Sequence, residues 1–277
     1  MKNTPIKQTL LAAMLACLAV SASAHRSWLL PTATVVESRE PWVTIDAAVS
    51  ENLFDYDSNA LSLDGVVVIG PDGAAMAAPP VLAGKLRNSI DLKLAKDGTY
   101  KIALVSTSVM ASYKAGSEMK RFRGSEAAFA KEVPADAPEL RVTRVHARLE
   151  TFVTANTPST AALKPTGEGL EMVPVTHPND LRAGEVAKWR FQLDGKALPN
   201  FAFSLVPGGV RYRSVLGEIR VNTNAKGEAS VTLPEAGMYW LNASYPVNTG
   251  KGPGMGSEGA AVTKRFSYAA TIEILPQ

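Results

Sequence analysis

Histidine is the residue type of this 277-residue sequence best suited to metal chemistry, because the chain has a single cysteine. The three histidines are His25, His146 and His177. Imidazole nitrogens suit divalent ions of borderline softness, such as nickel, cobalt, copper and zinc. A site for one of these ions would have to be built around one or more of these positions.

His25 follows a stretch with the three parts of a secretory signal peptide. Lysines stand near its start, an apolar run covers residues 10–20, and small residues at 21–24 precede the histidine. The run is shorter than the about 20 apolar residues that a membrane-spanning helix needs. We therefore predict that residues 1–24 are removed by cleavage after Ala24, and that the product is periplasmic and soluble after export.

Cleavage after Ala24 would give His25 a free α-amine beside its imidazole, and these two nitrogens can close a chelate ring on one metal ion. An α-amine has a pKa near 8, against about 10.4 for a lysine amine, so a metal can compete for it near neutral pH. The apolar residues Trp28 to Pro31 follow closely. We expect them to hold the new terminus against the fold, since an unanchored terminus frays.

A different processing of the leader would use Cys17 as a lipid-anchored N-terminus, as in lipoproteins. The residues before it, Met14 to Ala16, fit that signal poorly, and the apolar run continues to Val20. Cleavage after Ala24 is therefore the preferred prediction.

His177 and Asp180 are the preferred further ligands for an ion at His25. They lie three residues apart in the turn-like segment 176–180, and this spacing can offer a nitrogen and an oxygen to one ion. The same segment is also typical of a turn in which Asn and Asp bond their own backbone. The predicted metal ligands are therefore His25, His177 and Asp180.

His146 is a weaker candidate because Arg144 and Arg148 share its strand face. Their positive charges disfavour a cation nearby. We expect His146 to be a strand residue that is hydrogen-bonded to Glu150 or to the backbone.

Other chemistry finds little support. The acidic cluster of Glu51, Asp55 and Asp57 lacks the spacing of an EF-hand, so we expect a solvated loop. The glycine-rich stretch 250–256 lacks the Gly-Lys-Ser/Thr ending of a phosphate-binding loop. Neither Gly-x-Ser-x-Gly nor His-Glu-x-x-His occurs. The sequence therefore favours a protein that is not an enzyme.

Net charge argues against a nucleic-acid partner. The formal charge of +3 falls to +1 when the two lysines of the leader are removed. A protein this close to neutral has no strong overall field toward nucleic acid or an acidic membrane. Without Cys17 the mature chain also has no disulfide, so hydrophobic cores must stabilise it.

The rest of the chain reads as short strands separated by turns rich in Gly, Pro, Asn and Asp. Alternating apolar residues predict antiparallel strands with one buried face. The polar, Pro-containing stretch 154–160 lacks this periodicity and is the expected boundary between two such series. We predict an all-β fold of two antiparallel β-sandwich domains, residues 25–155 and an Ig-like 165–277, with at most one short helix, within 116–131.

The mature chain resembles a bacterial family of exported two-domain β proteins, called unknown-function or NikM-like, the latter being the periplasmic component of a cobalt/nickel uptake system. The distinctive shared motif is His25-x-x-Trp28-Leu29-x-Pro31 directly after the leader. Segments 71–73, 194–199, 224–227 and 236–240 add support, although they recur in many Ig-like domains. The resemblance implies divalent-metal handling and an envelope transporter or receptor as partner.

Three hypotheses follow from these observations. The first is a periplasmic protein that binds nickel, cobalt, copper or zinc through His25 and passes it to an envelope transporter. The second is a copper redox enzyme in which His25 and another histidine form a brace. The third is a metal-free module that binds an envelope partner.

Overall fold

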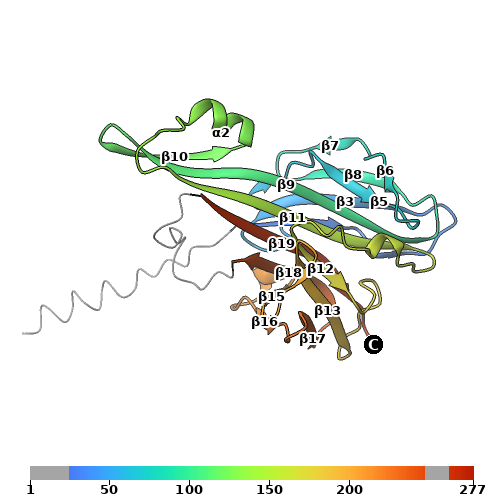
Figure 1. Ribbon diagram of the computed structural model, residues 1–277. Helices are drawn as coiled ribbons and strands as arrows, with labels where there is room; N and C mark the ends of the chain where they lie inside the picture. The colour runs from blue at the N-terminus through green and yellow to red at the C-terminus, as the bar shows by residue number, and fades with distance from the viewer. Residues whose placement is uncertain (1–24, 247–261) are drawn as a thin grey trace, which may run out of the picture.

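A computed structural model describes residues 25–246 and 262–277 of the chain. The predicted leader with Cys17 and the glycine-rich stretch 250–256 lie outside these residues. Three sheets account for the fold, as Figure 1 shows. The all-β prediction is confirmed.

The N-terminal sheet consists of β1 (Arg26–Pro31), β3 (Trp42–Ser50), β8 (Asn88–Lys93) and β7 (Val81–Ala83), with β4 (Asn59–Ala60) paired to β3. All of its pairings are antiparallel. The C-terminal sheet is also antiparallel. Its strands are β12 (Leu170–Pro174), β13 (Val186–Leu193) and β14 (Lys196–Ala197), with β17 (Glu228–Thr232) paired to β13.

The central sheet has ten strands and runs through both halves of the chain. Its main path is β16 (Ile219–Asn222), β15 (Ala202–Pro207), β18 (Gly237–Tyr245), β19 (Val262–Ile274), β11 (Arg141–Ala155), β9 (Gly98–Ala115), β5 (Val66–Ile69) and β6 (Ala75–Met76). β10 (Glu118–Gly124) pairs with β9, and β2 (Val35–Val36) pairs with β11. Two short 3-10 helices, η2 (Ala161–Leu163) and η3 (Val210–Tyr212), lie in connections.

The two outer sheets cover opposite faces of the central sheet. Neighbouring residues of β11 point to opposite sides, so this strand contributes to the core under each outer sheet. Phe152 belongs to the core under the C-terminal sheet, with Trp189 and Tyr268. Val153 belongs to the core under the N-terminal sheet, with Ile45. The predicted sandwiches at 25–155 and 165–277 are thus two cores that share one middle layer.

The shared layer contains a pairing that differs from the antiparallel prediction. β11 and β19 run parallel, from Val142 beside Val262 to Thr151 beside Thr271. β2 also runs parallel to β11. The two halves are therefore joined by backbone hydrogen bonds as well as by side-chain packing.

The helix prediction for 116–131 is correct only for its second part. The helix α2 (Glu126–Glu132) is the only α-helix in the described ranges, and the Ser125 hydroxyl caps it by accepting from the Ala128 amide. The first part is β10, because the chain turns at Gly116, with φ of 64°, and pairs back on β9. The far part of β9, which β10 pairs with, also has buried residues, since Val109 and Ala111 are buried.

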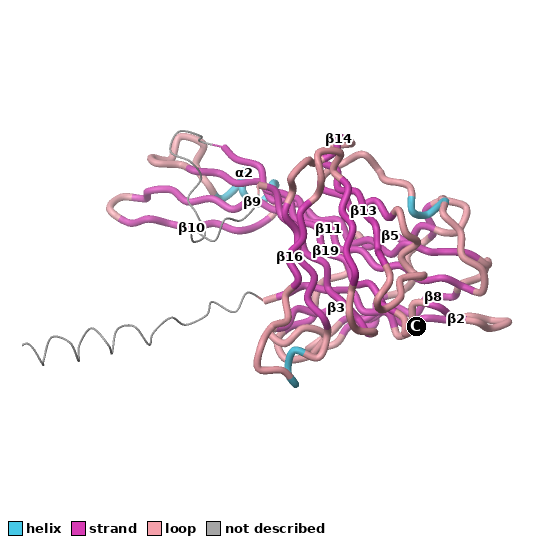
Figure 2. The backbone as a smooth tube through the Cα atoms, turned by 90° about the horizontal axis from the view of Figure 1, so that it is seen from below, coloured by secondary structure: helices cyan, strands magenta, loops and turns pink. Residues whose placement is uncertain are grey.

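β9, β10 and the start of β11 project from the body as an arm that carries α2 (Figure 2). A small core holds α2 on one face of this arm. It contains Val109, Ala111, Val142, Phe122 and Phe129. No helix within the described ranges is long and apolar enough to cross a membrane.

Candidate functional site

His25 lies directly before β1, at the edge of the N-terminal sheet, and its side chain is 53% exposed. Arg26 is paired with Ser50, so the residue before β1 lies beside the residue after β3. That residue is Glu51, whose Oε1 is 3.8 Å from His25 Nε2. The pairing of β1 with β3 therefore supplies His25 with a carboxylate from a different part of the chain.

Trp28 anchors this terminus to the fold, as the apolar stretch after His25 predicts. Its ring is buried, and its indole N–H donates to the Ser50 hydroxyl at 2.8 Å. From the other half of the chain, the Trp240 indole N–H donates to the Ser27 carbonyl at 3.1 Å. The segment next to His25 is thus held by both halves.

The acidic loop after β3 is shaped by its own hydrogen bonds. Asp57 accepts from the backbone amides of Glu51 and Asn52, at 3.0 and 2.9 Å. Although burial acts to raise the Asp57 pKa, these hydrogen bonds outweigh it and hold the pKa below its usual value. Asp55 instead pairs with Arg211 of the other half, at 3.0 Å. The three carboxylates therefore have separate partners, and the loop positions Glu51 next to His25.

His177 uses both ring nitrogens within the fold. Nδ1 accepts from the Asn179 amide at 3.2 Å, which assigns the proton to Nε2. Nε2 lies 3.2 Å from the Ser159 carbonyl and 3.0 Å from the Thr99 hydroxyl. His177 thereby ties its turn to β9 and to the segment that joins the two halves. Asp180 is exposed and lies 3.7 Å from Arg182.

His25 and His177 lie at opposite ends of β1. Its six residues span roughly 20 Å at a strand rise of about 3.3 Å. Beyond its far end, the Thr34 carbonyl accepts from the Thr154 amide. Thr154 bonds in turn to Thr99, the partner of His177. The structure therefore does not bring His25 together with His177 and Asp180.

His146 differs from its expected arrangement. Its ring stacks on Phe266 with centroids 5.1 Å apart. Glu150 instead accepts hydrogen bonds from Arg148 and Tyr268. In residues 25–246 and 262–277 there is no group of three or more His, Cys, Asp or Glu residues that could hold a metal ion. A metal at His25 would thus depend on the α-amine as a ligand.

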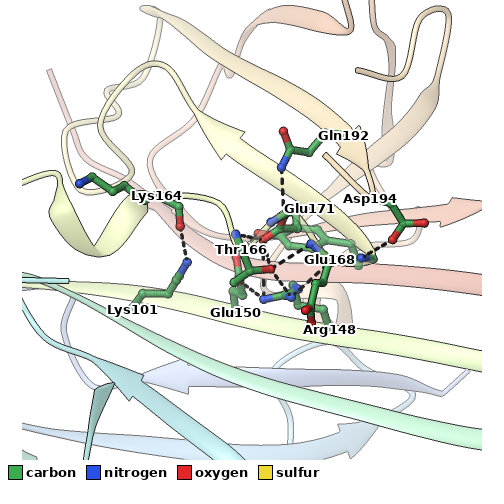
Figure 3. Close-up of polar contacts among 12 residues, drawn as sticks. Lys101, Arg148, Glu150, Lys164, Thr166, Glu168, Glu171, Gln192 and Asp194 are labelled. Carbon is green, nitrogen blue, oxygen red and sulfur yellow. Dashed lines mark hydrogen bonds and ion pairs between the residues drawn. The ribbon is translucent and has the colours of Figure 1, made fainter. Parts of the chain in front are cut away.

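A buried polar network between the central and C-terminal sheets was not predicted (Figure 3). Arg148 of β11 lies at its centre. Its Nη1 is 3.2 Å from Glu150 and 3.9 Å from Glu171 of β12, and its Nη2 donates to the Thr166 hydroxyl. The Tyr268 hydroxyl donates to Glu150 at 2.8 Å. One guanidinium thus balances two buried carboxylates from the two halves.

Hydrogen bonds keep Glu171 ionised despite its burial. Burial acts to raise its pKa, but the amides of Thr166 and Gly167 and the side chains of Gln192 and Thr166 donate to it and lower the pKa. Tyr268 shows the opposite effect, since burial and the neighbouring Glu150 raise its pKa well above 10.0. With its groups paired in this way, the network joins the sheets and presents no reactive group.

A pocket of about 240 Å³ lies beside His177. Its lining is mainly apolar, with Leu163, Val173 and Pro174, and Lys164 adds a cation. Since the ring nitrogens of His177 are already hydrogen-bonded, the pocket offers no evident reactive centre.

Sequence comparison places the chain in a family. A profile described as "Domain of unknown function (DUF4198)" matches residues 22–247, most of the chain. The chain therefore belongs to this family. Comparison with curated proteins gives no match.

Solved structures give distant likenesses. The "D0-D1 domain of Intimin" is 11% identical with a TM-score of 0.22, and the match covers 89% of this chain and 97% of that one. "The Bacillus anthracis TIE protein" is 10% identical with a TM-score of 0.18, covering 100% of this chain and 45% of that one. With TM-scores below 0.5, neither carries an inference about this chain.

Proposed function

We propose that the chain, once cut after Ala24, is a periplasmic protein that binds a divalent transition metal through the α-amine and imidazole of His25. The observation that carries this proposal is the position of His25, exposed at the head of a strand that buried Trp28 anchors. An anchored terminus loses less conformational freedom on binding an ion than a frayed one does. Copper, nickel, cobalt and zinc all suit two nitrogen ligands.

Glu51 supports this proposal as a positioning residue. In a chelate that includes the α-amine, Nδ1 is the ring nitrogen closer to the backbone and therefore the one that binds. This leaves Nε2 to face Glu51, at 3.8 Å from its carboxylate. A carboxylate beside the second nitrogen of a metal-bound histidine orients the ring and makes it a stronger ligand.

The resemblance to NikM-like proteins supports nickel or cobalt as the ion, and an envelope transporter as the receiver. The copper redox alternative needs a second histidine beside His25. Neither His177, at the far end of β1, nor His146, on the opposite face of the central sheet, lies there. Metal binding without redox catalysis is therefore the function that we propose.

Removing either nitrogen should abolish chelation. We expect the mature protein to bind Cu²⁺ most tightly and Ni²⁺ next, by the usual order of divalent affinities. N-terminal acetylation, which blocks the amine, and His25→Ala, which removes the imidazole, should each weaken binding at least about tenfold, or about 1.4 kcal/mol. Isothermal titration calorimetry with the four ions measures this.

His177→Gln is the matched control, because that histidine lies away from the proposed site; it should keep the affinity of the unmodified protein. Equal binding by all four proteins, no binding by the unmodified one, or an exported protein whose mass shows a start other than His25 would each contradict the proposal.

Glu51→Gln tests the positioning role separately. We expect about a tenfold loss of metal affinity, at the lower end of the range for such supporting residues. Both side chains are more than half exposed, so the melting temperature should not change. Calorimetry and thermal unfolding of the same sample give both values, and an unchanged affinity would exclude Glu51 from the site.

A further inference from the structure

The arm carries a basic face on the side opposite α2. On β10, Met119, Arg121 and Arg123 alternate with Phe122, which packs in the small core under α2. Arg121 is paired with Ser112 of β9, and Ser112 with Arg141 of β11. These side chains therefore share one face of three adjacent strands.

Among the residues that the structure describes, no element covers this face where the arm leaves the body. Further along β9 the residues of the same parity, such as Tyr100 and Ile102, are buried under the N-terminal sheet. The arm projects past that sheet (Figures 1 and 2). In consequence Met110 and Met119 are 44% and 55% exposed, and Arg121, Arg123 and Arg141 are exposed as well.

The three arginines have no acidic partner among the residues that the structure describes. No carboxylate oxygen lies within 4 Å of their guanidinium nitrogens there. Lys114, on the same face, is paired with Glu139 at 3.4 Å, and Arg144 pairs with Glu126. Although the net charge of the whole chain is small, this face of the arm therefore has a local excess of positive charge.

We propose that this basic face, formed by Arg121, Arg123, Arg141, Met110 and Met119, docks the protein on a bilayer that contains anionic phospholipids. Arginines near such a surface are attracted to lipid phosphates, and exposed apolar side chains beside them can enter the headgroup region. Arg121 and Arg141 stand two strand spacings apart, about 10 Å, and Arg123 lies about 7 Å along β10 from Arg121.

A bilayer fits this face better than other anionic partners do. The face is an open sheet surface whose positive charges are spread over separate strands. Lipids can move laterally to meet each guanidinium, whereas a protein with fixed carboxylates would need matching positions. Nucleic acid is disfavoured because this face has no aromatic side chain on which bases could stack.

Sedimentation with lipid vesicles tests the proposal on the mature chain. We expect binding to vesicles of phosphatidylcholine mixed with phosphatidylglycerol, little binding to phosphatidylcholine alone, and a loss of binding at high salt. The triple variant Arg121→Gln, Arg123→Gln, Arg141→Gln should bind about a hundredfold more weakly, at about fivefold per charge.

A matched triple variant, Lys188→Gln, Arg190→Gln, Lys226→Gln, removes the same charge from exposed positions on the other half and should keep its affinity for vesicles. Met110→Ser with Met119→Ser should weaken binding without changing its salt dependence. The proposal is overturned if the arm variant binds vesicles like the unmodified protein does, or if the two triple variants lose affinity equally. It is also overturned if the unmodified protein binds no vesicle, or if polyglutamate binds the arm as well as the vesicles do.

Discussion

Replacing Arg148 by methionine is expected to lower the free energy of unfolding by about 3–5 kcal/mol at pH 7. The methionine fills much of the same space but leaves Glu150 and Glu171 buried without the guanidinium between them. Removing one partner of a buried ion pair costs more than the pair contributes, because the remaining charge stays out of water. Urea unfolding monitored by tryptophan fluorescence gives the value.

The pH dependence of this loss identifies its cause. In the unmodified protein the Glu171 pKa is lowered on folding, so its contribution is present above pH 4.5 and is lost as the pH falls through the folded pKa. Tyr268 has a raised pKa, so its contribution is present below pH 10.0 and is lost above it. In Arg148→Met, Glu171 loses its neighbouring cation and protonates more readily. The difference in the free energy of unfolding between the unmodified protein and Arg148→Met should therefore narrow as the pH falls from 7 toward 4.5.

Two further variants serve as controls for the Arg148 prediction. Arg190→Met makes the same change on an exposed strand position of β13 and should stay within about 0.5 kcal/mol of the unmodified protein. Adding Glu171→Gln to Arg148→Met removes one unpaired charge and should recover part of the loss. A loss that does not change with pH, or that Glu171→Gln deepens, would mean that packing and not charge is responsible.

The sequence predicts the strands of this fold well but not how they join. Alternation is a local property, so segments such as 42–49 and 140–153 can be assigned from neighbouring residues alone. The parallel pairing of β11 with β19 links residues about 120 positions apart, and no local pattern encodes it. The segment from Gly116 shows the same limit, because its first part is a strand only through its pairing with β9.

The buried network was missed for a related reason. Arg148 and Glu150 stand on a strand face that carries several charged residues, which resembles a solvent-facing surface. Only the C-terminal sheet, packed over that face, turns them into buried groups. Glu171 offered a local signal, as an acid between Leu170 and Met172, since such residues are rarely buried without a partner.

The candidate metal site is likewise only partly predictable from the sequence. The position of His25 after a leader can be read from the sequence, and so can the anchoring role of Trp28. The nearness of Glu51 follows from the register of β1 on β3, which the sequence alone does not give. Ligand type and spacing in a turn favour His177 as a metal ligand, but its ring nitrogens instead form hydrogen bonds at the junction between the halves.

Trp28→Ala is expected to destabilise the protein by about 3–5 kcal/mol, as for other buried large-to-small changes. The ring lies 5.6 Å from both Phe54 and Tyr56 and packs in a cluster with Leu53 of the N-terminal half and Val206 of the C-terminal half. Its loss would also leave the buried Ser50 hydroxyl without its donor. Urea unfolding measures the change.

Trp42→Ala is the matched control, since this tryptophan also lies in the N-terminal sheet but is 54% exposed, and it should change stability by no more than about 0.5 kcal/mol. The free energy of unfolding of Trp28→Phe should lie between those of Trp28→Ala and Trp42→Ala, because phenylalanine keeps an apolar ring but not the indole N–H.

A different result is expected if Trp28 only fastens the terminus. Its loss would then let an aminopeptidase trim past His25 without lowering the global free energy of unfolding. Because Trp28 contacts both halves, we expect global destabilisation, and trimming alone would refute a shared cluster.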